Sequence, residues 1–135
     1  MKILVLFLAL ICAYCHSVEV SDKLLDAIET VESNCNENAV GDNGKAVGAY
    51  QQHAVFVCDV NRILKEDLYT LEDRKSAFLA RRMAKIYLTY YGNRYERITG
   101  KRASNEVLAR IYNGGATGYK KQATKSYWNK IKKFL

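Results

Sequence analysis

Apolar residues recur three and four positions apart over most of the chain, which predicts a mainly helical protein. Ser21 is a favourable N-terminal cap for a first helix. Apolar positions then follow at helical spacing at Leu24, Leu25, Ile28 and Val31. Similar patterns predict four more helices, over residues 52–64, 70–92, 104–114 and 119–134. The helix over 70–92 starts at the cap Thr70 and stops near Gly92. The helix over 104–114 ends at Gly114-Gly115.

Residues 34–49 break the helical periodicity and are rich in glycine. The turn-forming pair Asn43-Gly44 lies between two Ala-Val pairs, which predicts a short β-hairpin. Proline is absent, so the turns depend on Gly, Asn and Asp. The expected fold class is therefore mainly α (α+β): about five helices around one core, with a small β-hairpin.

The N-terminus has the order of a secretory signal. Lys2 precedes an apolar run from Ile3 to Ala13, and the residues around Cys15 and Ser17 offer a cleavage site after either of them. The run is shorter than the roughly 20 residues that span a bilayer, so no stable membrane insertion is expected. We therefore expect a secreted chain with a signal peptide at 1–17 and a single domain at 18–135, acting as a monomer.

Positive charge is concentrated at the C-terminus. Residues 119–135 hold six lysines and no acidic residue. Such a segment favours anionic polymers of a cell wall as partners, although a solvated helix face would carry the same pattern. A nucleic-acid partner is not expected, because the chain has no recognisable nucleic-acid-binding motif.

Two cysteines, Cys35 and Cys58, remain after the predicted signal peptide. An even number in an oxidising compartment predicts a disulfide, which would stabilise the fold by about 3 kcal/mol. Two free thiols are the alternative. No metal site and no cofactor are expected, because His53 is the only histidine after residue 17 and no CxxC motif survives there.

Glu32 is the strongest candidate for chemistry. On a helical wheel it falls inside the apolar stripe of the first helix, between Ile28 and Leu25. A carboxyl group among aliphatic side chains is poorly solvated, which raises its pKa and suits it to act as a general acid. A glutamate of the last helical turn that bends back to solvent is the alternative.

The run VESNCNENAVGDNGKAVGAYQ (31–51) resembles the catalytic region of goose-type lysozymes and soluble lytic transglycosylases. In that superfamily Glu-Ser is followed by Gly-Leu-Met-Gln and later by Ala-Tyr-Asn. Here the three motifs are Glu32-Ser33, Gly48-Ala49-Tyr50-Gln51 and Ile111-Tyr112-Asn113. The second departs from the family pattern at its two middle positions, and the third at its first.

The resemblance implies a lysozyme-like catalytic domain over 18–135, with the hairpin beside the active-site cleft. It implies that Glu32 protonates the glycosidic oxygen and that Ser33 supports its orientation. The residues implied to line the cleft and bind the glycan are Gly48, Gln51, Tyr112 and Asn113. Bacterial peptidoglycan glycan strands are the implied partner.

Asp42 bears on the reaction type. Goose-type lysozymes carry an aspartate six residues before the glycine of the second motif, and Asp42 holds that place ahead of Gly48. The resemblance then implies a general base that activates water. In the alternative, Asp42 only caps the Asp-Asn-Gly turn, and the sugar's own hydroxyl attacks, as in a lytic transglycosylase.

The expected function is thus peptidoglycan hydrolysis by a muramidase, antibacterial or digestive. The alternatives are a lytic transglycosylase that leaves 1,6-anhydromuramic acid, chitin cleavage, and a non-enzymatic cationic wall-binding antimicrobial protein.

Overall fold

The computed structural model describes residues 16–135, so nearly all of the predicted signal peptide lies outside the described residues. The elements are α1 (Asp22–Ser33), β1 (Val40–Gly41), β2 (Ala46–Val47), α2 (Ala54–Leu64), α3 (Ala77–Thr99), α4 (Asn105–Gly114) and α5 (Lys125–Ile131), joined by loops and short 3-10 helices. The predicted fold class is confirmed. Within residues 16–135 no helix is long and apolar enough to cross a membrane.

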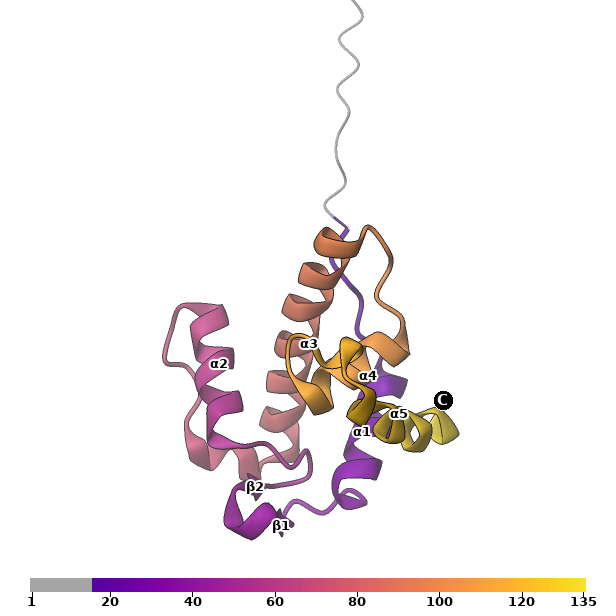
Figure 1. Ribbon diagram of the computed structural model, residues 1–135. Coiled ribbons are helices and arrows are strands. Elements are labelled where there is room, and N and C mark those ends of the chain that lie inside the picture. The colour runs from indigo at the N-terminus through magenta and orange to yellow at the C-terminus, as the bar shows by residue number, and fades with distance from the viewer. Residues whose placement is uncertain (1–15) are drawn as a thin grey trace, which may run out of the picture.

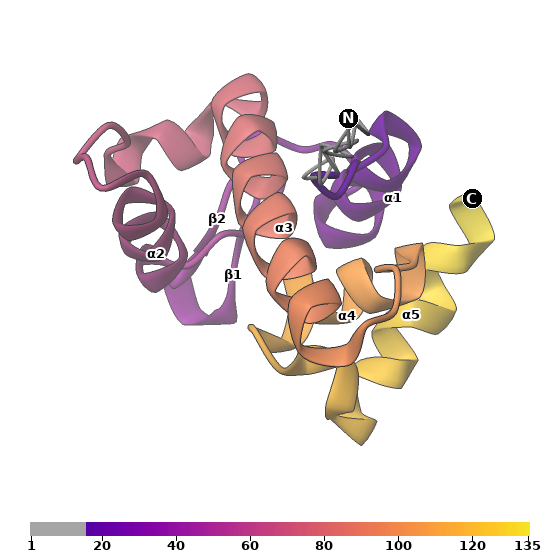
Figure 2. The ribbon, with the colours of Figure 1, turned by 90° about the horizontal axis from the view of Figure 1, so that it is seen from above.

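The long helix α3 runs through the middle of the molecule (Figures 1 and 2). Helix α2 lies on one side of it, whereas α1, α4 and α5 pack together on the other. Fully buried aliphatic and methionine side chains from these helices form one core, among them Leu24, Ile28, Met83, Leu88, Leu108, Ile111 and Ile131. Burial of this apolar surface is the main favourable term in folding.

Several local predictions are confirmed. Ser21 caps α1 by accepting a hydrogen bond from the backbone N–H of Leu24. The hairpin forms where the turn pair predicts it, with Val40 opposite Val47 in antiparallel register. Helix α4 begins after the cap Ser104, and Gly115 follows its last residue.

Helix α3 differs from its prediction at both ends. Thr70 caps a short 3-10 helix, Leu71–Lys75, and α3 begins only after a second cap, Ser76. At the other end, α3 continues past Gly92 to Thr99. Gly92 is present for close packing, because a side chain there would press on Leu108 and Val18 at about 3 Å. A glycine that allows close approach carries the same sequence signal as one that ends a helix.

The fifth predicted helix is broken into shorter pieces. Two 3-10 helices, Gly118–Lys120 and Gln122–Thr124, precede α5, and a third follows it. Gly118 packs so closely on α4 that a Cβ atom would lie 1.9 Å from the carbonyl oxygen of Arg110. The buried hydroxyl of Thr124 donates to the carbonyl of Gly118 and accepts from the Arg110 guanidinium. These tertiary contacts outweigh the helical preference of the segment.

The predicted disulfide is absent, which corrects the sequence analysis. Cys35 and Cys58 are free and exposed thiols. Cys35 follows the end of α1 and Cys58 lies on α2, and these two helices stand on opposite sides of α3 (Figures 1 and 2). The even number of cysteines gave no information about this separation.

Candidate active site

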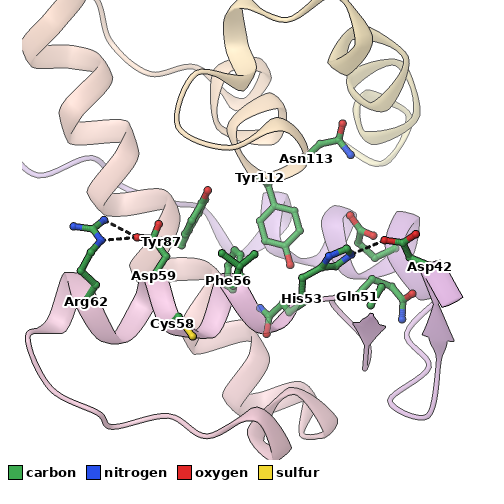
Figure 3. A pocket seen from close by; sticks show the side chains of 14 residues that line it. Asp42, Gln51, His53, Phe56, Cys58, Asp59, Arg62, Tyr87, Tyr112 and Asn113 are labelled. Carbon is green, nitrogen blue, oxygen red and sulfur yellow. Dashed lines mark hydrogen bonds and ion pairs between the residues drawn. The ribbon is translucent and has the colours of Figure 1, made fainter. Parts of the chain in front are cut away.

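A cleft of about 730 Å³ brings together residues from α1, the hairpin, the loop before α2, and the helices α2, α3 and α4. Glu32 reaches it from the end of α1, Asp42 from the hairpin turn, and Gln51 from the loop before α2. Tyr112 and Asn113 reach it from α4 (Figure 3). Five of the seven residues proposed from sequence for catalysis or glycan binding therefore line one cleft.

Glu32 lies in a poorly hydrated part of the cleft. Burial raises its pKa from 4.5 to about 7, against a hydrogen bond from Tyr127 and the positive charge of Lys130, which both lower it. Burial has the larger effect because removing water destabilises the carboxylate more than these partners restore. At neutral pH a substantial fraction of Glu32 therefore carries a proton.

The hydrogen bond at Glu32 also determines which oxygen can carry that proton. The Tyr127 hydroxyl donates to Oε1 at 2.8 Å. Oε1 thus acts as the acceptor, which leaves Oε2 to hold the acidic hydrogen. Tyr127 is itself buried, and its pKa lies well above 10 because burial and the nearby Glu32 charge both oppose ionisation. It remains a hydrogen-bond donor over the pH range in which Glu32 titrates.

Tyr112 forms part of the apolar surface near Glu32. Its hydroxyl donates to the backbone carbonyl of Tyr50 at 2.7 Å, which fixes the ring. Burial and the Glu32 charge raise its pKa well above 10. The ring meets Phe56 edge-on with centroids 5.5 Å apart, and Phe56 stacks on Tyr87 at 4.4 Å. These three rings give the middle of the cleft an apolar, aromatic wall.

Ser33 and Gly48 do not line the cleft, but they hold its parts in place. The Ser33 hydroxyl donates to the carbonyl of Ala49 at 2.7 Å and accepts from the N–H of Asn36. It thereby ties the end of α1 to the segment after the hairpin. Gly48 has φ +82°, and a Cβ atom there would lie 1.8 Å from the carbonyl oxygen of Arg74. Only glycine fits this position.

Gln51 and Asn113 differ in how firmly they are held. Both N–H groups of the Gln51 amide are engaged, with the carbonyls of Ala39 and Gly48 at 3.1 and 2.9 Å. Its carbonyl oxygen is thereby oriented by the loop and can accept from a ligand. Asn113 is exposed at the cleft beside Tyr112 (Figure 3). Its amide can both donate and accept.

Asp42 is paired with a histidine that the sequence analysis had considered only as a metal ligand. His53 Nε2 lies 3.2 Å from Asp42 Oδ2, and both side chains are partly exposed. Asp42 adopts a positive φ of 49° in the turn, which an aspartate tolerates. The pair lies at one end of the cleft, and an Asp59–Arg62 pair lies at the other (Figure 3).

Sequence reasoning missed several residues of the site. The sequence analysis gave no role to Tyr127, Phe56, Asp59 or Arg62. The helical spacing of Phe56, Asp59 and Arg62, three residues apart on α2, was a usable signal for a shared face. No signal in the sequence connects Tyr127 with Glu32, which lies 95 positions away.

No protein-family model matches the chain, and a search of curated proteins finds no match. The chain is similar to solved structures, among them the following two. A chain of "Crystal structure of Aeromonas hydrophila PliI in complex with Meretrix lusoria lysozyme" matches with TM-score 0.69 and 27% identity, covering 87% of this chain and 93% of that one. "Crystal structure of inhibitor bound lysozyme from Meretrix lusoria" matches with TM-score 0.66 and 29% identity, over 84% and 89%. The fold is lysozyme-like, as the sequence motifs implied.

The raised pKa of Glu32 predicts a pH-dependent stability. The native state holds the Glu32 proton more tightly than the unfolded chain between pH 4.5 and about 7, so the free energy of unfolding falls as pH rises through this range. Glu32→Gln removes this penalty. The variant should gain on the order of 3 kcal/mol relative to wild type between pH 4 and pH 8. Urea unfolding at both pH values measures the difference, and a difference that does not change with pH would contradict it.

Proposed function

We propose that the protein is a muramidase: it hydrolyses the β-1,4 bond between N-acetylmuramic acid and N-acetylglucosamine in bacterial peptidoglycan. The observation that carries this proposal is Glu32, a carboxyl group with a pKa of about 7 inside a cleft large enough for a glycan. The lysozyme-like fold supports the same substrate class. A protein that only bound cell walls would have no use for a poorly solvated carboxyl group in its cleft.

In the proposed reaction Glu32 is the general acid. Its Oε2 proton passes to the glycosidic oxygen as the bond to the leaving sugar breaks, because an alcohol leaves more readily than an alkoxide. The resulting carboxylate is stabilised by the Tyr127 hydroxyl on Oε1 and by the positive charge of Lys130. The partners that lower the pKa of Glu32 thus stabilise the charge that it acquires during the reaction.

Asp42 is the proposed general base. Its Oδ2 contacts His53, so Oδ1 is left to take a proton from the attacking water. Asp42 is exposed and therefore accessible to water, unlike Glu32. The two carboxyl groups thus differ in environment as an acid and a base should: Glu32 is poorly hydrated and has a raised pKa, whereas Asp42 is exposed to water.

The remaining residues position the glycan in this proposal. The oriented carbonyl of Gln51 and the amide of Asn113 suit the acetamido groups of the sugars, which contain one donor and one acceptor. The aromatic wall around Tyr112 suits the apolar face of a sugar ring. Ser33 and Gly48 act indirectly: the Ser33 hydroxyl ties the end of α1 to the segment after the hairpin, and Gly48 lets that segment pack closely against Arg74.

The first functional prediction concerns Glu32. Glu32→Gln keeps the shape of the side chain but has no acidic proton, so hydrolysis of purified peptidoglycan should fall by about 10²–10⁴-fold or more. Glu19→Gln, which changes an exposed glutamate outside the cleft, is the matched control and should behave as wild type. Clearing of a cell-wall suspension measures both variants. Wild-type clearing by Glu32→Gln would overturn the enzymatic proposal.

A second prediction concerns the products. Water activated by Asp42 should give fragments with an ordinary muramic acid reducing end. In Asp42→Asn we expect hydrolysis to fall at least about 10-fold, the low end of what loss of a general base costs, while the cleft still binds glycan. Mass spectrometry of the digested peptidoglycan distinguishes the outcomes.

Two results would revise the proposed reaction type or the role of Asp42. Wild-type fragments that are mainly 1,6-anhydro products, lighter by one water, would make the protein a lytic transglycosylase with the same acid. Hydrolytic products formed at full rate by Asp42→Asn would leave the reaction class standing and remove Asp42 as its base.

The basic C-terminal segment is proposed to hold the enzyme near anionic cell-wall polymers. Lys125, Lys130, Lys132 and Lys133 are exposed on or just after α5, and no acidic residue lies in residues 119–135. Their attraction to a polyanion is screened over about 8 Å at physiological salt. The segment should therefore matter most at low ionic strength and on a charged substrate.

Lys125→Gln, Lys132→Gln and Lys133→Gln combined should slow lysis of whole cells at low salt. Cleavage of a short uncharged chitooligosaccharide should barely change. Lys130 is kept, because its charge acts on Glu32. A triple variant with Arg97, Lys101 and Arg102 replaced by glutamine removes the same charge elsewhere on the exposed surface and serves as the control. Equal losses by the two triple variants on whole cells would refute a local role.

A further inference from the structure

The end of the cleft farthest from Asp42 contains an arginine that the proposed reaction does not use. Arg62 lies nine residues after His53 along α2, which places the two about 14 Å apart along the helix axis. Figure 3 shows the Asp59–Arg62 pair beyond Phe56 and Tyr87, away from Asp42 and His53. A glycan in the cleft would therefore reach Arg62 at a sugar removed from the bond that is cut.

The guanidinium of Arg62 is held in a defined position. Its Nε donates to Asp59 Oδ1 at 2.7 Å, and its Nη2 lies 2.6 Å from the same oxygen. Nη2 also donates to the hydroxyl of Tyr91 at 3.1 Å, and the group lies over the ring of Tyr90. An arginine fixed in this way loses little conformational freedom when a ligand binds.

Part of the guanidinium is left for a ligand. Asp59 is itself fully engaged, because its Oδ1 contacts Arg62 and its Oδ2 accepts from the Tyr91 hydroxyl. The contacts of Arg62 with Asp59 and Tyr91 use its Nε and Nη2, and Nη1 carries two further donors. The side chain is more than half exposed and lines the cleft. A charged N–H donor at a cleft wall can bind a carboxylate oxygen by a charge-assisted hydrogen bond.

A second hollow continues from this point. It is lined by Arg62 and Cys58, which also line the cleft, and by Asn61, Lys65, Glu66 and Asp67. The surface beyond Arg62 is thus concave and carries charged groups of both signs. A branch from a glycan strand could leave the cleft there.

We propose that Arg62 binds a carboxylate on the muramic acid side branch, and that this contact makes the enzyme prefer peptidoglycan to chitin. Chitin has the same backbone and acetamido groups but no carboxylate. The proposal rests on the proposed function, because it assumes a glycan in the cleft. In intact strands the carboxylate belongs to the peptide, because the lactyl carboxyl forms the amide bond to it; the lactyl carboxylate is free only where the peptide has been removed.

The test compares KM values for two substrates, soluble peptidoglycan strands and an uncharged chitooligosaccharide. In Arg62→Gln, the ratio of KM for peptidoglycan to KM for the chitooligosaccharide should rise about 10-fold, the scale of one lost hydrogen bond to a charged group. Glycan strands from which the peptides have been removed form the third substrate. If the ratio for these strands rises as well, Arg62 also binds the lactyl carboxylate that removal of the peptide frees; if only intact strands respond, Arg62 binds a carboxylate of the peptide. Either result supports the proposal.

A double variant separates recognition from the loss of charge balance. Arg62→Gln alone leaves Asp59 without its partner, and the freed negative charge could repel an anionic substrate. Asp59→Asn combined with Arg62→Gln removes both charges. The proposal expects the double variant to keep the raised KM ratio. A return to the wild-type ratio, or an unchanged ratio in Arg62→Gln alone, would overturn it.

Direct binding keeps this test separate from the proposed function. Glu32→Gln should still bind glycans, and calorimetry with a muropeptide and with a chitooligosaccharide gives both affinities without turnover. Adding Arg62→Gln to Glu32→Gln should weaken muropeptide binding about 10-fold relative to chitooligosaccharide binding. Equal weakening of both ligands would contradict the role of Arg62, whereas failure of the wild type to cleave either substrate would contradict the proposed function alone.

Discussion

The site depends on the hydrogen bond from Tyr127 to Glu32, made where little water reaches. The first and last α-helices of the domain supply its two sides. Burial alone would raise the pKa of Glu32 further, whereas full hydration would leave the carboxyl group ionised at neutral pH. The tyrosine hydroxyl and the charge of Lys130 bring the pKa back to about 7. At that value the carboxyl group can both give a proton and retain the charge that results.

The rest of the fold places an exposed wall of the cleft, which carries Asp42, opposite the poorly hydrated surroundings of Glu32. The core formed by α1, α3, α4 and α5 fixes Glu32 and Tyr112, while the hairpin and α2 carry Asp42 and His53 on the other wall. The Ser33 hydroxyl connects the two parts directly through the carbonyl of Ala49. The difference in hydration between the walls follows from this division, because one wall belongs to the core and the other is an exposed turn. The proposed two-carboxyl mechanism needs this difference in hydration as well as the contact between Tyr127 and Glu32.

The sequence predicted what local chemistry determines. Helix caps, the hairpin turn and the apolar setting of Glu32 depend on neighbours within a few residues, and the structure has them. Contacts between distant segments could not be predicted from these signals. Gly92 allows α3 to pack against α4 but had the pattern of a helix end, and Thr124 breaks the last helix through a bond to Arg110. The Tyr127 partner of Glu32 was missed for the same reason, since only the folded chain brings them together.

The most direct test of this account is the titration of Glu32 itself. Carbon-13 NMR of glutamate-labelled protein, with Glu32→Gln used to assign the signal, follows the side-chain carboxyl carbon from pH 3 to pH 9. The account predicts a midpoint near the pKa of about 7 that burial imposes, well above the ordinary value of 4.5. A midpoint close to 4.5 would mean that Glu32 is solvated and ionised at neutral pH, and it would contradict its role as the acid.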